Sequence, residues 1–276
     1  MVELATLDYL SIFALLMVVV IGLPHGALDG AVAMHLGVGR SINAILKFLA
    51  SYLLCAIFVI IIWYNFPDLS LVVFLIISMI HFGWGDANSN LRSQFFLQIV
   101  SHGGIVTFGI VYFHVDEVLP IFDMLTQSNS YFVIQFSKFI FYIISFFTFI
   151  YFTLIFRNQA LRLRFLELIF VWLIVISVPP LLSFAVYFCF VHTARHIRNI
   201  WNELKIKINP KIIISQAIIL TIASWIFGIF ALYYIDSGDL DSDIIRVIFI
   251  GLAALTVPHM ILVDGFFRKK LLSKYR

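Results

Sequence analysis

The sequence predicts an all-α fold: a polytopic integral membrane helical bundle of about eight to nine transmembrane helices, in one domain over residues 1–276. Hydrophobic residues make up 62% of the chain and charged residues 12%, whereas a soluble domain carries roughly 25% charged residues. The mean hydropathy is +1.05. Much of the apolar content falls in stretches of about 20 residues, the length at which a helix crosses the hydrocarbon of a bilayer.

Seven stretches have the length and apolar character of membrane spans, and an eighth stretch is ambiguous. The seven are 7–27, 44–64, 69–87, 93–114, 131–156, 212–235 and 244–264. The stretch 161–201 makes either one long span or two short ones, because Pro179 and Pro180 interrupt it and proline removes a helix donor. Two spans place the basic loop 195–211 and the basic tail 268–276 on the cytoplasmic side, as the positive-inside rule requires. We therefore expect nine spans, with the N-terminus outside and the C-terminus in the cytoplasm.

Charge and cysteine content argue against several other classes. The net charge of +3 is small and the basic residues cluster in loops, so no nucleic-acid partner is expected. Glu3 and Asp8 stand where a cleavable signal would carry positive charge, so no such signal is expected. We expect a multi-pass protein of the inner (plasma) membrane, surrounded by lipid. Cys55 and Cys189 lie in apolar runs as small fillers, which argues against a disulfide or a cysteine-based metal site.

Five histidines lie inside apolar, membrane-length stretches: His25, His81, His192, His196 and His259. An ionisable ring in hydrocarbon is expensive, so such a residue indicates function, and imidazole is the commonest metal ligand. Counted at about 1.5 Å per helical residue from the predicted span ends, all five fall in the cytoplasmic half of the bilayer, at depths within roughly 10–12 Å of one another. The sequence therefore predicts a nitrogen-rich transition-metal site in that layer.

The other three histidines fit this layer less well. His35 falls in a loop or interfacial helix and His114 falls near the outer face, so neither is expected at the site. His102, in the sequence SHGG, has a compatible depth and stays open as a candidate.

His192 and His196 form the strongest local motif, HTARH. Positions i and i+4 share a helix face, so both rings can reach one ion. For an isolated motif of this kind, an interfacial histidine pair beside a basic loop is an equally good explanation.

Acidic residues follow the other three intramembrane histidines at short spacing. Asp29 follows His25 in PHGALDG, Asp86 follows His81 in HFGWGD, and Asp264 follows His259 in PHMILVDG. A carboxylate commonly accepts the second N–H of a metal-bound imidazole, so Asp29 can serve its own histidine or a neighbouring one. The alternatives are helix caps, and for His81 a hydrogen-bonded packing histidine. Gly26 is expected to let another helix approach closely. The repeated PH…DG pattern reflects either a weak internal repeat or chance.

Four motifs in this order resemble the Brp/Blh family of β-carotene 15,15′-dioxygenases, integral-membrane enzymes that supply retinal to microbial rhodopsins. The motifs are PHGALD, HFGWGD, HTARH and PHMILVD, and they cover nearly the whole chain. The resemblance implies cleavage of the central double bond of β-carotene by O₂, giving two molecules of all-trans-retinal at a mononuclear Fe(II) site. Carried over by motif, the implied iron ligands are His25, His81, His192 and His196. His259 is implied as a substitute ligand or as a group that supports a ligand.

The residues are compatible with that chemistry. Four neutral imidazoles leave iron its full 2+ charge with open positions, and a substrate that partitions into lipid meets a site inside the bilayer. No general acid or base is needed, so Asp29, Asp86 and Asp264 are expected to orient imidazoles or to cap helices. Aromatic residues are frequent in the predicted spans, and Phe184, Tyr187, Phe188 and Phe190 precede HTARH. Most aromatic residues are expected to pack and a minority to line a tunnel for a polyene, without a pattern in the sequence that separates the two groups.

Three other classes stay open on the residues alone. A di-iron desaturase or hydroxylase needs more histidines in several boxes, and this chain has one HxxxH box. A transporter that uses His and Asp relays predicts polar residues across the full depth of the bilayer. A haem protein needs two axial histidines on facing helices.

Overall fold

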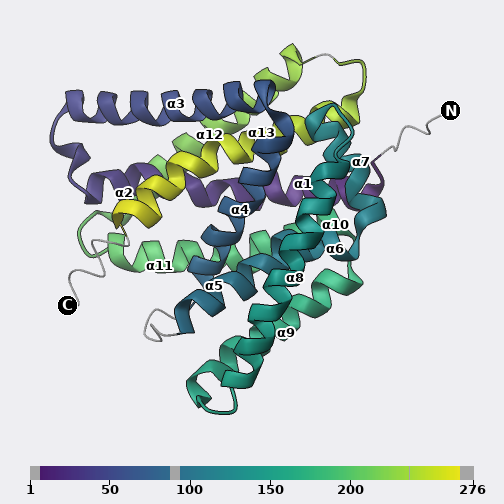
Figure 1. Ribbon diagram of the computed structural model, residues 1–276. Coiled ribbons are helices and arrows are strands. Elements are labelled where there is room, and N and C mark those ends of the chain that lie inside the picture. Colours follow the sequence, from purple (N-terminus) through teal and green to yellow (C-terminus); the bar gives the residue numbers. More distant parts are fainter. Residues whose placement is uncertain (1–6, 88–93, 236, 268–276) are drawn as a thin grey trace. The chain divides into compact units, whose positions relative to one another are not determined.

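The computed structural model describes residues 7–87, 94–235 and 237–267, and for His25 and Arg40 it describes the backbone only (Figure 1). Every regular element in these ranges is a helix, which confirms the all-α prediction. Among the described residues, seven helices are long and apolar enough to cross a membrane: Tyr9–His35, Ile42–Asn65, Pro67–Asp86, Phe95–Phe113, Tyr131–Leu154, Pro210–Tyr234 and Leu240–Phe267. The chain is thus a polytopic helical membrane protein.

The helix breaks at the proline pair, as the sequence predicts. Helix α9 (Arg162–Ser177) ends before Val178, and helix α10 (Pro180–Val186) begins after Pro179. Val178 and Pro179 have ψ angles of 137° and 149°, so the backbone is extended between the two helices. With 16 residues, α9 rises about 24 Å, which is short of a hydrocarbon core of roughly 30 Å. The expectation that both helices cross the membrane stays a prediction.

The chain divides into two compact units. Unit 1 comprises Met1–Leu15 and Pro67–His192, and unit 2 comprises Leu16–Phe66 and Thr193–Arg276. The boundary between His192 and Thr193 falls within the HTARH motif. Each unit therefore contains one histidine of this motif, and each is described separately below.

Unit 1 consists of helices α4 to α10 and the first part of α1. Its elements after α1 (Tyr9–Met17, which ends in unit 2) are α4 (Pro67–Asp86), α5 (Phe95–Gly104), η5 (Ile105–Gly109), α6 (Ile110–Phe113), α7 (Val115–Thr126), α8 (Tyr131–Leu154), η6 (Gln159–Leu161), α9, α10 and η7 (Tyr187–Thr193, whose last residue belongs to unit 2). Helix α5 packs against both α4 and α8.

Two glycines let the backbones of α4 and α5 approach closely. A Cβ added at Gly83 would collide with the backbone of Ile99, and one added at Gly103 would collide with the carbonyl of Met79. Small residues at a membrane helix interface permit this kind of backbone contact. Since His81 lies two residues before Gly83, the contact fixes the part of α4 that carries this histidine.

Unit 2 contains the N-terminal helical run after α1, helix α3, and the chain from α11 to its last described residue. Its elements are η1 (Val18–Gly22), η2 (Leu23–Leu28), α2 (Asp29–His35), η3 (Val38–Arg40), α3 (Ile42–Asn65), α11 (Ala194–Leu204), α12 (Pro210–Tyr234), α13 (Leu240–Met260) and η8 (Ile261–Phe267). Helix α3 packs on α13, and α12 packs on η2 and α2. Apolar side chains such as Leu54 and Phe58 of α3, and Phe227 and Ile229 of α12, are exposed in the structure. In a membrane protein such surfaces face lipid.

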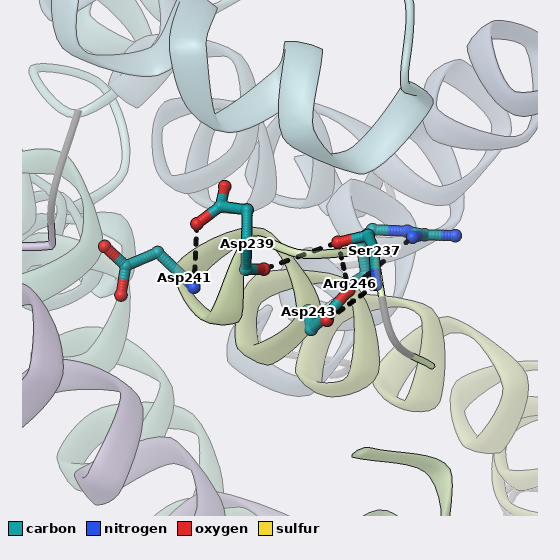
Figure 2. A network of polar contacts seen from close by, with 5 residues as sticks. All are labelled: Ser237, Asp239, Asp241, Asp243 and Arg246. Carbon is teal, nitrogen blue, oxygen red and sulfur yellow. Dashed lines mark hydrogen bonds and ion pairs between the residues drawn. The ribbon is translucent and has the colours of Figure 1, made fainter. Parts of the chain in front are cut away.

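A polar network holds the turn that precedes α13 (Figure 2). Ser237 Oγ donates to Asp243 Oδ1 at 2.7 Å, and the Asp239 side chain caps the helix by accepting from the N–H of Asp241 at 3.2 Å. The guanidinium of buried Arg246 lies 3.8 Å from Asp243 Oδ1. Pairing offsets the cost of burying both charges, and the network fixes where α13 begins.

The helices depart from α geometry near several histidines. Segment η2, which contains His25, is 3₁₀-helical, whereas η7, which contains His192, is π-helical. Segment η8 is π-helical and starts two residues after His259, which itself follows Pro258 inside α13. Departures of this kind are frequent at functional sites, because they redirect side chains without ending the helix.

Candidate functional site

The first histidine pair lies in unit 1 and joins α4 to η7. His81 and His192 are both buried, with 2% and 1% of their surface exposed. Their ring centroids are 4.8 Å apart and the ring planes meet at 64°. The structure therefore brings two of the four predicted ligands into ring contact.

Aromatic rings enclose this pair within unit 1. The Phe82 ring centroid lies 4.8 Å from that of His192 and 5.5 Å from that of Tyr187. Phe188 stacks on His192 at 6.1 Å and 13°, and Phe184 stacks on Phe188 at 5.3 Å and 12°. Three nearly parallel rings thus follow one face of the helix at four-residue spacing. Their apolar surfaces keep water away from the imidazoles.

Asp86, the last residue of α4, is held by a tyrosine of η7. The hydroxyl of Tyr187 donates to Asp86 Oδ2 at 2.7 Å, and both side chains are buried. This hydrogen bond ties the end of α4 to the helix that carries His192. The sequence does not predict this role of Tyr187, because nothing in its spacing indicates a carboxylate partner 101 residues away.

The second histidine pair lies in unit 2 and joins α11 to α13. His196 and His259 are buried, and their ring centroids are 5.0 Å apart with planes at 52°. His259, expected as a substitute ligand or a supporting group, is therefore in ring contact with a predicted ligand. Pro258 precedes it and removes one backbone donor from α13 at this point.

Asp29 is bound to His259 and to a tyrosine of α3. His259 Nδ1 lies 2.8 Å from Asp29 Oδ1, and the hydroxyl of Tyr52 donates to Asp29 Oδ2 at 2.8 Å. Asp29 is 3% exposed and His259 is 2% exposed. Of the two roles expected for Asp29, the structure supports the one in which it serves a histidine other than its neighbour in sequence.

Segment η2 places the backbone of His25 in unit 2, and its side chain lies outside the described part of the chain. The close helix approach expected at Gly26 is wrong, because a Cβ added there meets no atom within 4 Å. A Cβ at Gly30 would instead meet Leu220 and Gln216 of α12, at 3.2 and 3.3 Å. Helix α12 thus approaches about one turn later than the sequence suggests.

Asp264 lies in η8, is 7% exposed, and belongs to a segment that packs against α2. The nearby His35 is the last residue of α2, and its ring contacts Phe267 edge-on at 5.4 Å. Of the two positions expected for His35, a loop or an interfacial helix, the structure places it in a helix, and its position at the membrane interface stays a prediction.

His114 lies at the start of α7, where its ring makes hydrogen-bonding contacts. Its Nε2 lies 2.7 Å from the carbonyl oxygen of Val175, near the end of α9, and its Nδ1 lies 3.2 Å from Glu117 Oε1. The ring therefore connects the α6–α7 junction to α9. His102 is buried in α5, with its ring 6.2 Å from that of Tyr151, and its role stays open.

The imidazoles of the intramembrane histidines that the structure describes fit a metal ion that prefers nitrogen ligands. Neutral imidazole suits iron, zinc and copper, and the four described intramembrane histidines are at most 5% exposed. An ionised carboxylate only accepts hydrogen bonds, so an ionised Asp29 requires the proton of His259 to lie on Nδ1. The lone pair of His259 then lies on Nε2, which is the form that a metal ligand requires.

Comparison with known sequences identifies the family. The sequence profile described as "Beta-carotene 15,15'-dioxygenase" matches residues 16–267. A protein of uncultured marine bacterium 66A03, named beta-carotene 15,15'-dioxygenase, is 38% identical over 257 residues, which cover 92% of this chain and 93% of that protein. No solved structure matches the chain significantly.

The fold and the buried histidine pairs define an integral membrane helical protein with nitrogen-rich polar centres. The chain belongs to the β-carotene 15,15′-dioxygenase family. Membership confirms the resemblance carried by the four motifs, and it confirms that the protein is an enzyme of the dioxygenase type.

Proposed function

We propose that the protein cleaves the central 15,15′ double bond of β-carotene with O₂ and yields two molecules of all-trans-retinal at a mononuclear Fe(II) centre. One observation carries the proposal: the family match over residues 16–267 includes all five intramembrane histidines. The alternatives of a desaturase, a haem protein or a transporter have no comparable support.

We propose His25, His81, His192 and His196 as the iron ligands. Their support is the motif correspondence, the contact of His81 with His192 in unit 1, and the burial of His196 in unit 2. His259 is proposed as a supporting group or an alternative ligand. Asp29, Asp86 and Asp264 are proposed to orient imidazoles or helix ends, with Asp29 acting on His259.

When bound, Fe(II) supplies the electrons that make O₂ reactive toward a double bond. The residues of the chain bind, orient and exclude water. The rings of Phe82, Phe184 and Phe188 provide an apolar, π-rich surface beside His192, which suits a conjugated hydrocarbon. Both oxygen atoms of O₂ end in the two aldehydes, so the net reaction moves no proton and needs no acidic or basic side chain.

We further propose that the two units act as one transmembrane domain over residues 1–276, in the inner (plasma) membrane, with the N-terminus outside and the C-terminus cytoplasmic. β-Carotene reaches the enzyme through the lipid bilayer, since it is insoluble in water. Retinal leaves by the same route and is handed to a microbial rhodopsin.

The test is expression in cells that accumulate β-carotene. Orange colour should fade while retinal appears at two molecules per carotene lost, and growth under ¹⁸O₂ should label each aldehyde before it exchanges with water. Purified protein should contain about one iron per chain and show no Soret band. If well-expressed, iron-loaded protein leaves β-carotene intact, the proposal is wrong. A Soret band would instead favour haem, and two irons per chain would favour a di-iron enzyme.

A further inference from the structure

Within the described part of unit 2, the hydroxyl of Tyr52 donates a hydrogen bond to the Asp29 carboxylate. Its O–H is 2.8 Å from Asp29 Oδ2, whereas the other oxygen of that carboxylate bonds to His259. Tyr52 lies on α3, Asp29 begins α2, and His259 lies near the end of α13. Three separate helices therefore contribute one residue each to a continuous chain of hydrogen bonds.

The tyrosine also contacts the helix that carries the histidine. Its hydroxyl lies 3.4 Å from the carbonyl oxygen of Leu255, which is one turn before His259 in α13. An ionised carboxylate in a buried position must have both oxygens satisfied, since an unpaired buried charge is very costly. With Tyr52 bonded to Oδ2, Oδ1 stays directed at His259 Nδ1.

We propose that Tyr52 is a positioning residue that acts through Asp29: it keeps the N–H of His259 on Nδ1 and thereby presents the lone pair of Nε2 to the metal ion. The inference rests on the proposed function for the identity of that ion as Fe(II), and it takes the alternative in which His259 is a ligand. It assigns a role to a residue of α3, a helix that has no histidine and otherwise exposes an apolar surface.

A purely structural role for Tyr52 makes a different prediction. If its hydroxyl only fastens α3 to α13, then removing it destabilises the fold and leaves the affinity for metal unchanged. If Tyr52 acts through Asp29, its removal weakens metal binding only while Asp29 is present. A double-mutant cycle on metal affinity separates the two cases.

The experiment titrates Co²⁺, a visible substitute for Fe(II), into the full-length metal-free protein in detergent. Asp29→Asn should weaken binding 10–100-fold, as changes in groups that support ligands do. Tyr52→Phe should weaken it about tenfold, the size of one hydrogen bond to a charged group. The double variant should bind no more weakly than Asp29→Asn alone.

Tyr64→Phe is the matched control. Tyr64 lies on the same helix, and its ring packs under Arg246 at 5.7 Å, a contact that Phe retains. Its Co²⁺ affinity should equal that of the wild type. Unchanged affinity in Tyr52→Phe, or losses that add fully in the double variant, would overturn the inference.

A measurement on the unmodified chain keeps the inference testable if a variant fails to fold. In ¹⁵N-histidine-labelled, metal-free protein, His259 should show its proton on Nδ1, whereas a proton on Nε2 would overturn the inference. Neither experiment uses carotene. Wild-type protein that binds Co²⁺ as described but leaves β-carotene intact when iron-loaded would overturn the proposed function and leave the role of Tyr52 standing.

Discussion

In each unit, a tyrosine hydroxyl from another helix donates a hydrogen bond to a buried aspartate. In unit 1 Tyr187 donates to Asp86, and in unit 2 Tyr52 donates to Asp29, at 2.7 and 2.8 Å. Tyrosine suits this task inside a membrane, because its ring packs like any apolar side chain while its hydroxyl reaches one polar partner. In both units the acid lies close in sequence or in space to a histidine pair.

Loss of a predicted ligand should remove the metal. Replacing His192 or His196 by Ala is expected to abolish cleavage of β-carotene and to lower bound iron, because the remaining imidazoles form an incomplete coordination shell. Iron content of the purified variants and retinal yield measure the two effects. The control is His35→Ala, whose ring contacts Phe267. Normal iron and normal turnover in either variant would remove that histidine from the proposed ligand set.

The charge of Asp29 should matter for turnover as well as for metal affinity. Asp29→Asn keeps the shape of the side chain but loses the charge that holds the proton on His259 Nδ1, so we expect a 10–100-fold loss of activity with the fold intact. Asp29→Ala should lose more, because it leaves Tyr52 and His259 without their shared partner. If the Asp29→Asn variant keeps its full iron content and full turnover, Asp29 has only a packing role.

His114 should contribute to stability and not to catalysis. Its ring is hydrogen-bonded between Glu117 and the carbonyl of Val175, so His114→Ala is expected to cost about 1–3 kcal/mol of the free energy of unfolding. Thermal unfolding in detergent measures the loss, and iron per chain should stay at the wild-type value. A variant with wild-type stability, or one that loses iron while folded, would contradict this assignment.

At the level of the elements, the packing of α4 on α5 depends on the absence of side chains at Gly83 and Gly103. Gly103→Ala places a methyl group against the carbonyl of Met79, so the two helices must separate. We expect a loss of about 1–3 kcal/mol in stability, as for other overpacked sites, together with weaker metal binding through displacement of His81.

A glycine of α12 supplies the control for this change. A Cβ at Gly228 meets no atom within 4 Å, so Gly228→Ala should leave stability unchanged or raise it by about 0.5–1 kcal/mol. Unfolding midpoints of the two variants, measured in the same detergent, make the comparison. Equal midpoints would show that the α4–α5 contact is looser than its geometry indicates.

The helix types near the histidines explain part of what sequence could not predict. Apolar periodicity indicates where a membrane helix lies, but the turn at η7 and the turn at η8 are π-helical. A π turn rotates the following side chains relative to an α-helix, so the face on which a residue lies changes along the segment. The i, i+4 argument for His192 and His196 assumes a regular helix, and these two residues flank the point where η7 gives way to α11.

For the whole molecule, the membrane class, the buried histidines and the break at Pro179-Pro180 are predictable because they depend on composition, length and proline chemistry. The partners of the acids are not. Asp29 has a histidine four residues before it and bonds to one 230 residues after it, and no local pattern distinguishes the two. The same limit applies to Tyr52 and Tyr187, since the chain has 11 tyrosines, several of them on apolar helices.

The orientation of the chain in the membrane is testable through the break at Pro179-Pro180. If α9 and the helical run that starts at Pro180 each cross the bilayer, the loop before α12 is cytoplasmic and the turn before α13 is outside. Reporters fused at Asp123 and at Asp239 should then report the outside, and one fused at Lys207 should report the cytoplasm. The difficulty is the length of α9, whose roughly 24 Å fall short of the hydrocarbon thickness.

Charged side chains at the start of α9 can compensate for the short length of this helix in the membrane. Arg164 pairs with Glu167 at 2.7 Å, and the side chain of Arg162 reaches the carbonyl of Ile155 at 3.2 Å. Long basic side chains extend toward the headgroups while their stems stay in lipid, so α9 can cross with its first turn at the interface. If the Lys207 reporter appears outside, the proline pair is a kink within a single crossing. The depths of His192, His196 and His259 would then have to be counted again, and a common iron site would lose its support from the sequence. The ring contact of His81 with His192 within unit 1 does not depend on the topology.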